Sequence, residues 1–161
     1  AGIFLDTKGF TFKTGVRTFE AAAYLRRMGV DPVNIRRLFK TDIRDSVRLS
    51  KVISSAKIYR DNIAVAVCED TGKDLQVLVA KAADELLNIS GIEASFVIAR
   101  LGHKIIISGR SLETVNVQLI LERLGGGGHI TIAGAQLSNQ DMDIALEQLQ
   151  KAIDDVLDDR E

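Results

Sequence analysis

The chain has 161 residues, a formal net charge of −1 and 46% hydrophobic residues, enough apolar side chains for the core of one ordinary domain or two small ones. No apolar stretch approaches the roughly 20 residues that cross a bilayer, and the first residues lack the basic segment and cleavage site of a signal peptide. We therefore expect a globular chain without a membrane span, in a reducing compartment where the single Cys68 needs no disulfide partner.

Charge is divided unevenly along the sequence. Residues 1–60 carry 13 Lys and Arg against 5 Asp and Glu, a net of +8, whereas residues 61–161 carry 8 against 17, a net of −9. A basic segment suits an anionic substrate or an ionic interface with the acidic segment, and it equally suits a helical face that stays solvated. The two segments are expected to be electrostatically different bodies.

The N-terminal residues predict a strand followed by a helix. Residues 1–5 are apolar, begin without Met and indicate a short buried strand that is part of a longer protein. Asp6 follows directly, at the end of a strand, where α/β sheets commonly present functional carboxylates. Thr18 is a suitable N-cap for a helix that continues to residue 28.

Two further helices are expected before the pattern changes. Asp31 is a suitable N-cap and Pro32 suits the first helical position, which predicts a helix over residues 31–39. The segment 43–57 has apolar residues along one side and basic residues along another, which predicts an amphipathic helix that connects two bodies.

From residue 59 onwards strands and helices alternate, in the order β-α-β-β-α-loop-β-α. This order predicts an α/β fold in which helices flank a small mixed sheet. The expected strands cover residues 63–67, 94–101, 104–108 and 131–137, and the expected helices cover residues 74–88, 115–124 and 142–157. We divide the chain into a mainly helical segment, 1–41, a connecting helix, 42–58, and a sheet domain, 59–161.

A run of four glycines ends in a histidine at residues 125–129. Glycine reaches φ > 0 without strain, so Gly126, Gly127 and Gly128 could turn several backbone N–H groups towards one anion, and His129 adds a ring donor. A flexible linker or a multi-glycine turn is the alternative. Because the run lacks Ser and Pro and lies between two apolar segments, we interpret it as a ligand-binding loop.

A second group of polar residues is expected at the same end of the sheet. Arg110 and Ser111 are expected just past a strand, where a guanidinium and a hydroxyl could bind phosphate. Asn116, in the first turn of the next helix, could reach a base edge or a ribose. Taken singly, Arg110 is better explained by a surface ion pair and Asn116 by helix capping; together with the glycines they predict a nucleotide pocket.

These motifs resemble a known family. Residues 124–134 resemble the G-G-G-H…A-(A/G) signature of the DHH-associated domain, which follows the DHH phosphoesterase domain. Residues 107–118 and 2–22 are similar to cyclic-di-AMP phosphodiesterases of the GdpP type. The resemblance implies that residues 1–41 are the end of a DHH domain and that residues 59–161 are the DHH-associated, substrate-binding domain.

The resemblance also implies an enzyme with two metal ions, manganese (Mn²⁺), that hydrolyses cyclic-di-AMP to pApA. Of the family's metal ligands this chain matches only Asp6, and the D-x-D pair, the middle Asp and the Asp-His-His triplet are missing. Because one carboxylate cannot hold two ions, we expect this fragment to bind substrate without cleaving it. Two alternatives stay open: an oligoribonucleotide phosphodiesterase of the DHH family, and a nucleotide-binding regulatory module without catalysis.

The resemblance finally defines the expected partners. We expect a cyclic dinucleotide or a short oligonucleotide as ligand, no duplex nucleic acid and no membrane contact by this chain, and a homodimer stays open. Family members of this type carry N-terminal membrane helices, so the parent protein is expected to be membrane-anchored with this part at the cytoplasmic face.

Overall fold

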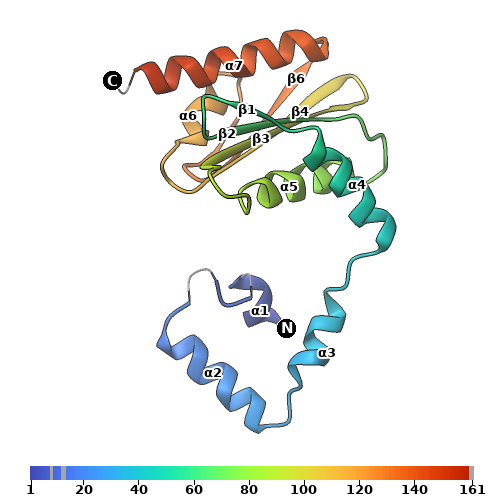
Figure 1. Ribbon diagram of the computed structural model, residues 1–161, viewed down its shortest axis with the longest axis vertical. Helices are drawn as coiled ribbons and strands as arrows, with labels where there is room; N and C mark the ends of the chain where they lie inside the picture. Colours follow the sequence, from blue (N-terminus) through green and yellow to red (C-terminus); the bar gives the residue numbers. More distant parts are fainter. Residues whose placement is uncertain (8, 12–13, 160–161) are drawn as a thin grey trace. The chain divides into compact units, whose positions relative to one another are not determined.

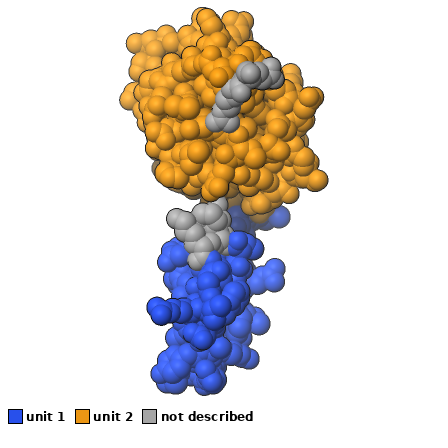
Figure 2. Space-filling model, turned by 90° about the vertical axis from the view of Figure 1, so that its left-hand side faces the viewer, with its two compact units in different colours: residues 1–43 blue, residues 44–161 orange. Residues whose placement is uncertain are grey.

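The computed structural model describes residues 1–7, 9–11 and 14–159. Its contacts divide the chain into two compact units, Ala1–Ile43 and Arg44–Glu161, coloured blue and orange in Figure 2. The division falls in the first turn of the helix that we expected to connect two bodies. Within the described ranges, no helix has both the length and the apolar character needed to cross a bilayer.

The first unit is built from helices (Figure 1): α1 (Gly2–Asp6), α2 (Val16–Arg27) and α3 (Pro32–Leu38). The predicted start of α3 is confirmed, because the Asp31 carboxylate accepts a hydrogen bond from the Val33 N–H at 3.1 Å. The second predicted helix is also present, but its N-cap is Gly15 and not Thr18.

The expected strand over residues 1–5 is wrong, because this segment forms α1. A strand needs a neighbouring strand to pair its backbone, and the described part of the first unit contains none. The segment instead pairs its own backbone, with the Leu5 N–H donating to the Ala1 carbonyl at 3.1 Å. Asp6 therefore ends a short helix.

The second unit is a six-stranded mixed sheet with helices on both faces (Figure 1), which confirms the predicted fold class. Only β2 and β3 are parallel; the other neighbours in the order β1-β2-β3-β4-β6-β5 are antiparallel. The strands are β1 (Lys57–Tyr59), β2 (Ile63–Cys68), β3 (Ala94–Leu101), β4 (Lys104–Ser111), β5 (Gly127–His129) and β6 (Ile132–Ser138). The helices are α4 (Ile43–Ser54), α5 (Leu75–Leu86), α6 (Val117–Glu122) and α7 (Met142–Asp158).

Two hydrophobic layers hold the helices on the sheet. On one face, α6 and α7 pack against the strands through side chains such as Ile120, which belongs to the same cluster as Phe96. On the other face, α4 and α5 pack through side chains such as Val52 and Leu86. β2 contributes to both layers and is buried along almost its whole length, as the apolar run 63–67 predicts.

The structure departs from the predicted elements at the edges of the sheet. The helix expected over residues 43–57 ends at Ser54, and the next residues form the edge strand β1, which pairs with β2. β4 continues to Ser111, beyond the expected end at residue 108. Consequently Arg110 lies inside a strand and not after one.

Candidate functional site

The sheet leaves part of one face open on the side of α5. Alternate residues of β6 are buried against α6 and α7, and the residues between them are exposed. Directly opposed residues of antiparallel strands point to the same side of a sheet, so the register arranges the open side in rows. We call these rows the outer sheet face: Arg110, Ile132 and His129; then Ser108, Gly134 and Gly127; then Ile106 and Gln136.

The Arg110 side chain is fixed on the outer sheet face and only 12% exposed. Its Nε donates to Asp84 Oδ1 on α5 at 3.2 Å, and its Nη1 donates to Ser108 Oγ and to the Gly109 carbonyl, both at 2.9 Å. These bonds use three of the five N–H donors of the guanidinium. The ion pair considered from the sequence is therefore present, and it fixes the side chain beside the exposed residues of the same row, Ile132 and His129.

The glycine run is not the loop that we expected. Gly127–His129 is the edge strand β5, paired with β6. A Cβ on Gly126 would collide with the Gly134 carbonyl oxygen, and one on Gly128 would collide with the Ile132 carbonyl oxygen. The absence of side chains at these two positions lets β5 and the residue before it approach the backbone of β6 closely.

Gly127 differs from its neighbours. A Cβ there would meet nothing within 4 Å, and the residue lies outside the positive-φ region. Its Cα partner on β6 is Gly134, so the middle row of the outer sheet face has glycine on two adjacent strands. This pair leaves open space beside Arg110 and His129.

The structure does not bring Ser111 or Asn116 to the outer sheet face. Ser111 is buried on the opposite side of β4, and its hydroxyl donates to the Ile130 carbonyl at 3.3 Å. Asn116 is the N-cap of α6, where its Oδ1 accepts from the Leu119 N–H at 3.2 Å. The capping alternative noted for Asn116 is therefore the role that the structure shows.

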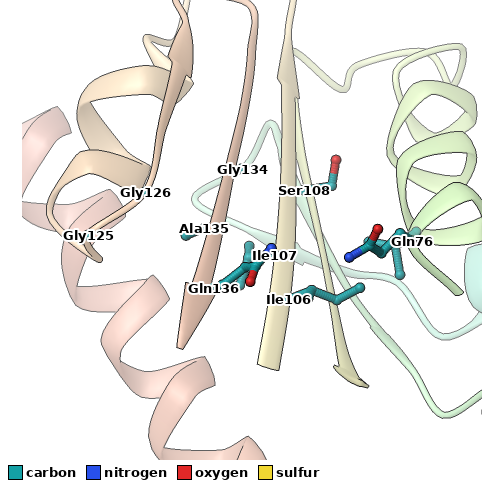
Figure 3. A pocket seen from close by; sticks show the side chains of 10 residues that line it. Gln76, Ile106, Ile107, Ser108, Gly125, Gly126, Gly134, Ala135 and Gln136 are labelled. Atoms are coloured by element: carbon teal, nitrogen blue, oxygen red, sulfur yellow. The ribbon is translucent and has the colours of Figure 1, made fainter. Parts of the chain in front are cut away.

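A pocket of about 530 Å³ opens on the side of β4 and β6 (Figure 3). Among its lining residues are Gln76 from α5, Ser108 from β4, and Gln136 and Gly134 from β6. Sequence reasoning missed Gln76 and Gln136. The alternation of exposed residues in β6 was the only available signal for Gln136, and Gln76 lies near it only because α5 packs beside β4.

Asp6 does not form part of a metal centre in the described chain. It is exposed at the end of α1, and no group of three or more His, Cys, Asp or Glu side chains suited to a metal ion occurs among the described residues. Two catalytic metal ions require several such ligands. These residues alone do not fit a two-metal site, and the role of Asp6 stays a prediction.

The family model described as the DHHA1 domain matches residues 60–159, which lie within the second unit. The chain belongs to the DHHA1 domain family. The matched residues include the glycine run and Arg110, two of the features on which the resemblance was based; the third, residues 2–22, precedes them.

Curated relatives extend the likeness to almost the whole chain. The chain is 49% identical over 156 residues to "Cyclic-di-AMP phosphodiesterase GdpP" of Geobacillus thermodenitrificans, covering 96% of this chain and 24% of that protein. It is 44% identical to "Cyclic-di-AMP phosphodiesterase PdeA" of Listeria monocytogenes, again covering 96% and 24%. The chain thus spans about a quarter of the length of these relatives.

Two more distant proteins are also similar. "Bifunctional oligoribonuclease and PAP phosphatase NrnA" of Thermus thermophilus is 28% identical, with 94% of this chain and 48% of that protein covered. The crystal structure of an exopolyphosphatase-related protein from Bacteroides fragilis superposes with a TM-score of 0.76 at 22% identity, covering 95% of this chain and 47% of the other. This structural likeness supports the fold.

Proposed function

We propose that this chain is the substrate-binding part of a metal-dependent phosphodiesterase that hydrolyses cyclic-di-AMP to pApA. The observation that carries the proposal is the row in which Arg110 and His129 flank Ile132 on an open sheet face. The names of relatives that are 44% and 49% identical supply the substrate class. In this proposal the manganese ions and the hydrolysis belong to the longer protein, to which Asp6 contributes one metal ligand, and this chain alone only binds.

The chemistry of the row suits a phosphate. Arg110 already makes three hydrogen bonds that fix its orientation, and the proposal assigns the two N–H donors of Nη2 to phosphate oxygens. His129 adds an imidazole N–H on the other side of Ile132. The neighbouring glycine pair, Gly127 and Gly134, provides the space that a sugar-phosphate needs to reach both side chains.

An oligoribonucleotide phosphodiesterase is the second candidate. The Thermus relative, whose name includes oligoribonuclease, supports it at 28% identity. A linear oligonucleotide would place a terminal phosphate in the same row. Relative affinity for cyclic-di-AMP and for a short oligoadenylate therefore separates the two candidates, and binding without turnover by the longer protein would instead indicate a regulatory module.

Calorimetric titration of the chain with cyclic-di-AMP and pApA tests the proposal. A charged hydrogen bond to phosphate contributes about 1.5–3 kcal/mol, so Arg110→Ala should weaken binding by roughly tenfold to more than a hundredfold. Arg100→Ala is the matched control, because Arg100 is 46% exposed near the end of β3 and pairs with Asp141. Unchanged affinity in a folded Arg110→Ala variant would remove the outer sheet face from the proposed function.

A further inference from the structure

The pocket on the outer sheet face differs in charge from the row beside it. Its lining includes two primary amides, Gln76 and Gln136, the Ser108 hydroxyl, and the apolar side chains of Val79 and Ile106, and none of its lining residues among the described ones is charged. Ser108 connects the two regions, because it lines the pocket and accepts a hydrogen bond from Arg110. An uncharged pocket thus adjoins the row that holds the Arg110 guanidinium.

The distance from the Arg110 row to the pocket is similar along β4 and along α5. From Arg110 to Ile106 the strand advances about 13 Å, and from Asp84 to Gln76 the helix covers about 12 Å. Asp84 pairs with Arg110 at one end, and Gln76 lines the pocket with Ile106 at the other. A mononucleotide is built in the same way, with an anionic phosphate at one end and a neutral base at the other.

The amide of Gln136 is already partly oriented. Lys104 Nζ donates to Gln136 Oε1 at 3.4 Å, so one lone pair of this carbonyl oxygen is engaged; the second lone pair and the NH₂ group remain for a ligand. Figure 3 shows Gln76 and Gln136 on either side of the β4 ribbon, over which the pocket opens. Both amides line this one pocket.

We propose that Gln76 and Gln136 bind the adenine base of the nucleotide whose phosphate lies at Arg110 and His129, an inference that rests on the proposed function. A glutamine amide matches adenine, because its oxygen accepts from the exocyclic amine and its NH₂ donates to a ring nitrogen. Guanine carries an oxygen in place of that amine, so the accepting amide would face a second acceptor. Because Lys104 fixes which end of the Gln136 amide carries the acceptor, Gln136 selects adenine over guanine.

The test compares AMP, GMP and ribose 5-phosphate by calorimetric titration into the full chain and into Gln76→Leu and Gln136→Leu. Leucine keeps most of the side-chain volume and removes the amide, and both positions are exposed, so the fold should be retained. Each variant should bind AMP about five- to a hundredfold more weakly, whereas its affinities for GMP and ribose 5-phosphate should be unchanged. Gln118→Leu, on α6 and bonded to Glu122, is the control that should leave every affinity unchanged.

Nuclear magnetic resonance on the unmodified chain gives a second readout that does not depend on a variant folding. The side-chain NH₂ signals of Gln76 and Gln136 should shift with AMP and not with ribose 5-phosphate. Equal AMP affinity in the chain and both variants, or unshifted amide signals at saturation, overturns the inference and leaves the phosphate site in place. Absence of binding by both AMP and ribose 5-phosphate overturns the inference and the proposed function together.

Discussion

The four consecutive glycines have distinct roles in the structure. Gly125 has a φ of 73° and follows the end of α6, Gly126 and Gly128 permit close approach to β6, and Gly127 borders open space. The sequence identifies the run as unusual, but it cannot assign these roles, because each depends on the pairing with β6. Two of the glycines that we expected to bind phosphate through their N–H groups, Gly126 and Gly128, therefore have packing roles.

Substitutions at adjacent glycines should have opposite effects. Gly126→Ala places a methyl group against the Gly134 carbonyl, so the strand must shift, and we expect a loss of about 1–3 kcal/mol in the free energy of unfolding. Gly127→Val fills space that is open in the chain, so its stability should stay within about 0.5 kcal/mol of the original while pApA affinity falls at least tenfold.

Urea unfolding and calorimetric titration of both glycine variants measure these effects. Each variant is a control for the other, because the two positions are neighbours in sequence, and a Cβ would collide with the Gly134 carbonyl at Gly126 but meet nothing within 4 Å at Gly127. A Gly127→Val variant that binds pApA normally would show that the open space is not used by the ligand. Equal stabilities for the two variants would contradict the packing role of Gly126.

At the scale of elements, the two strands that the sequence did not predict are the two shortest. The long segments at 94–101 and 142–157 coincide closely with β3 and α7, because a repeating pattern over many residues distinguishes strand from helix. β1 and β5 have three residues each, too few for a recognisable period, and both exist through pairing with a neighbour. The outer sheet face depends on β5, so its rows could not be derived from local pattern.

An ion pair joins α4 to the loop after β2. Arg48 donates from Nε and Nη2 to the two carboxylate oxygens of Asp70, each at 2.8 Å, and the Gly72 N–H donates to Asp70 at 2.7 Å. These hydrogen bonds, first of all those from Arg48, lower the pKa of Asp70 to about 2. Since this pKa lies below the ordinary value, the interaction stabilises the fold above about pH 4 and is lost as the pH falls towards 2.

Asp70→Asn should therefore lower stability at neutral pH by about 1–2 kcal/mol, with little effect at pH 2. Thermal unfolding between pH 2 and pH 7 measures the difference between the chain and the variant. Arg48→Met should reproduce the loss, because it removes the partner of the same carboxylate. A difference that is constant across this pH range would contradict the assignment.

At the scale of the whole molecule, the two units differ in how they are stabilised. Every buried hydrophobic side chain of the described residues lies in the second unit, from Val52 to Val156, whereas the described part of the first unit buries only Thr7. The sequence predicted two bodies from their charge, and this division of the core was not visible in composition, because both parts contain apolar residues.

Limited trypsin digestion should therefore leave the second unit as the resistant product. We expect early cleavage after Lys40 or Arg44, next to the division between the units, and a product that continues to the C-terminal region. The segment 57–62 should be protected, because β1 pairs with β2 and Arg60 is bonded to Asp154 on α7. N-terminal sequencing of the product checks this; a product that begins after residue 57 or 60, or a chain cut only on global unfolding, would contradict it.

The candidate site was predictable in part, for physical reasons. Arg110 and His129 could be singled out because a guanidinium and an imidazole beside glycines suit phosphate binding, and the register places them in one row. The sequence grouped Ser111 with Arg110 in one pocket, because both were expected to follow the strand. Once both lie within β4, these adjacent residues point to opposite faces of the sheet. Gln76 could be recognised as a pocket residue only once the packing of α5 on the sheet was known.

The most direct test of nucleotide binding by the outer sheet face is a titration of pApA into the isotopically labelled chain. The changes in the backbone amide chemical shifts then show which residues the ligand affects. The largest changes should occur at Gly126–His129, around Arg110 on β4 and at Ile132–Gly134, and Arg110→Ala should abolish them at the same ligand concentration. Saturable changes centred instead on the loop around Asp70, or an unaltered map in folded Arg110→Ala, would contradict the assignment of nucleotide binding to this face.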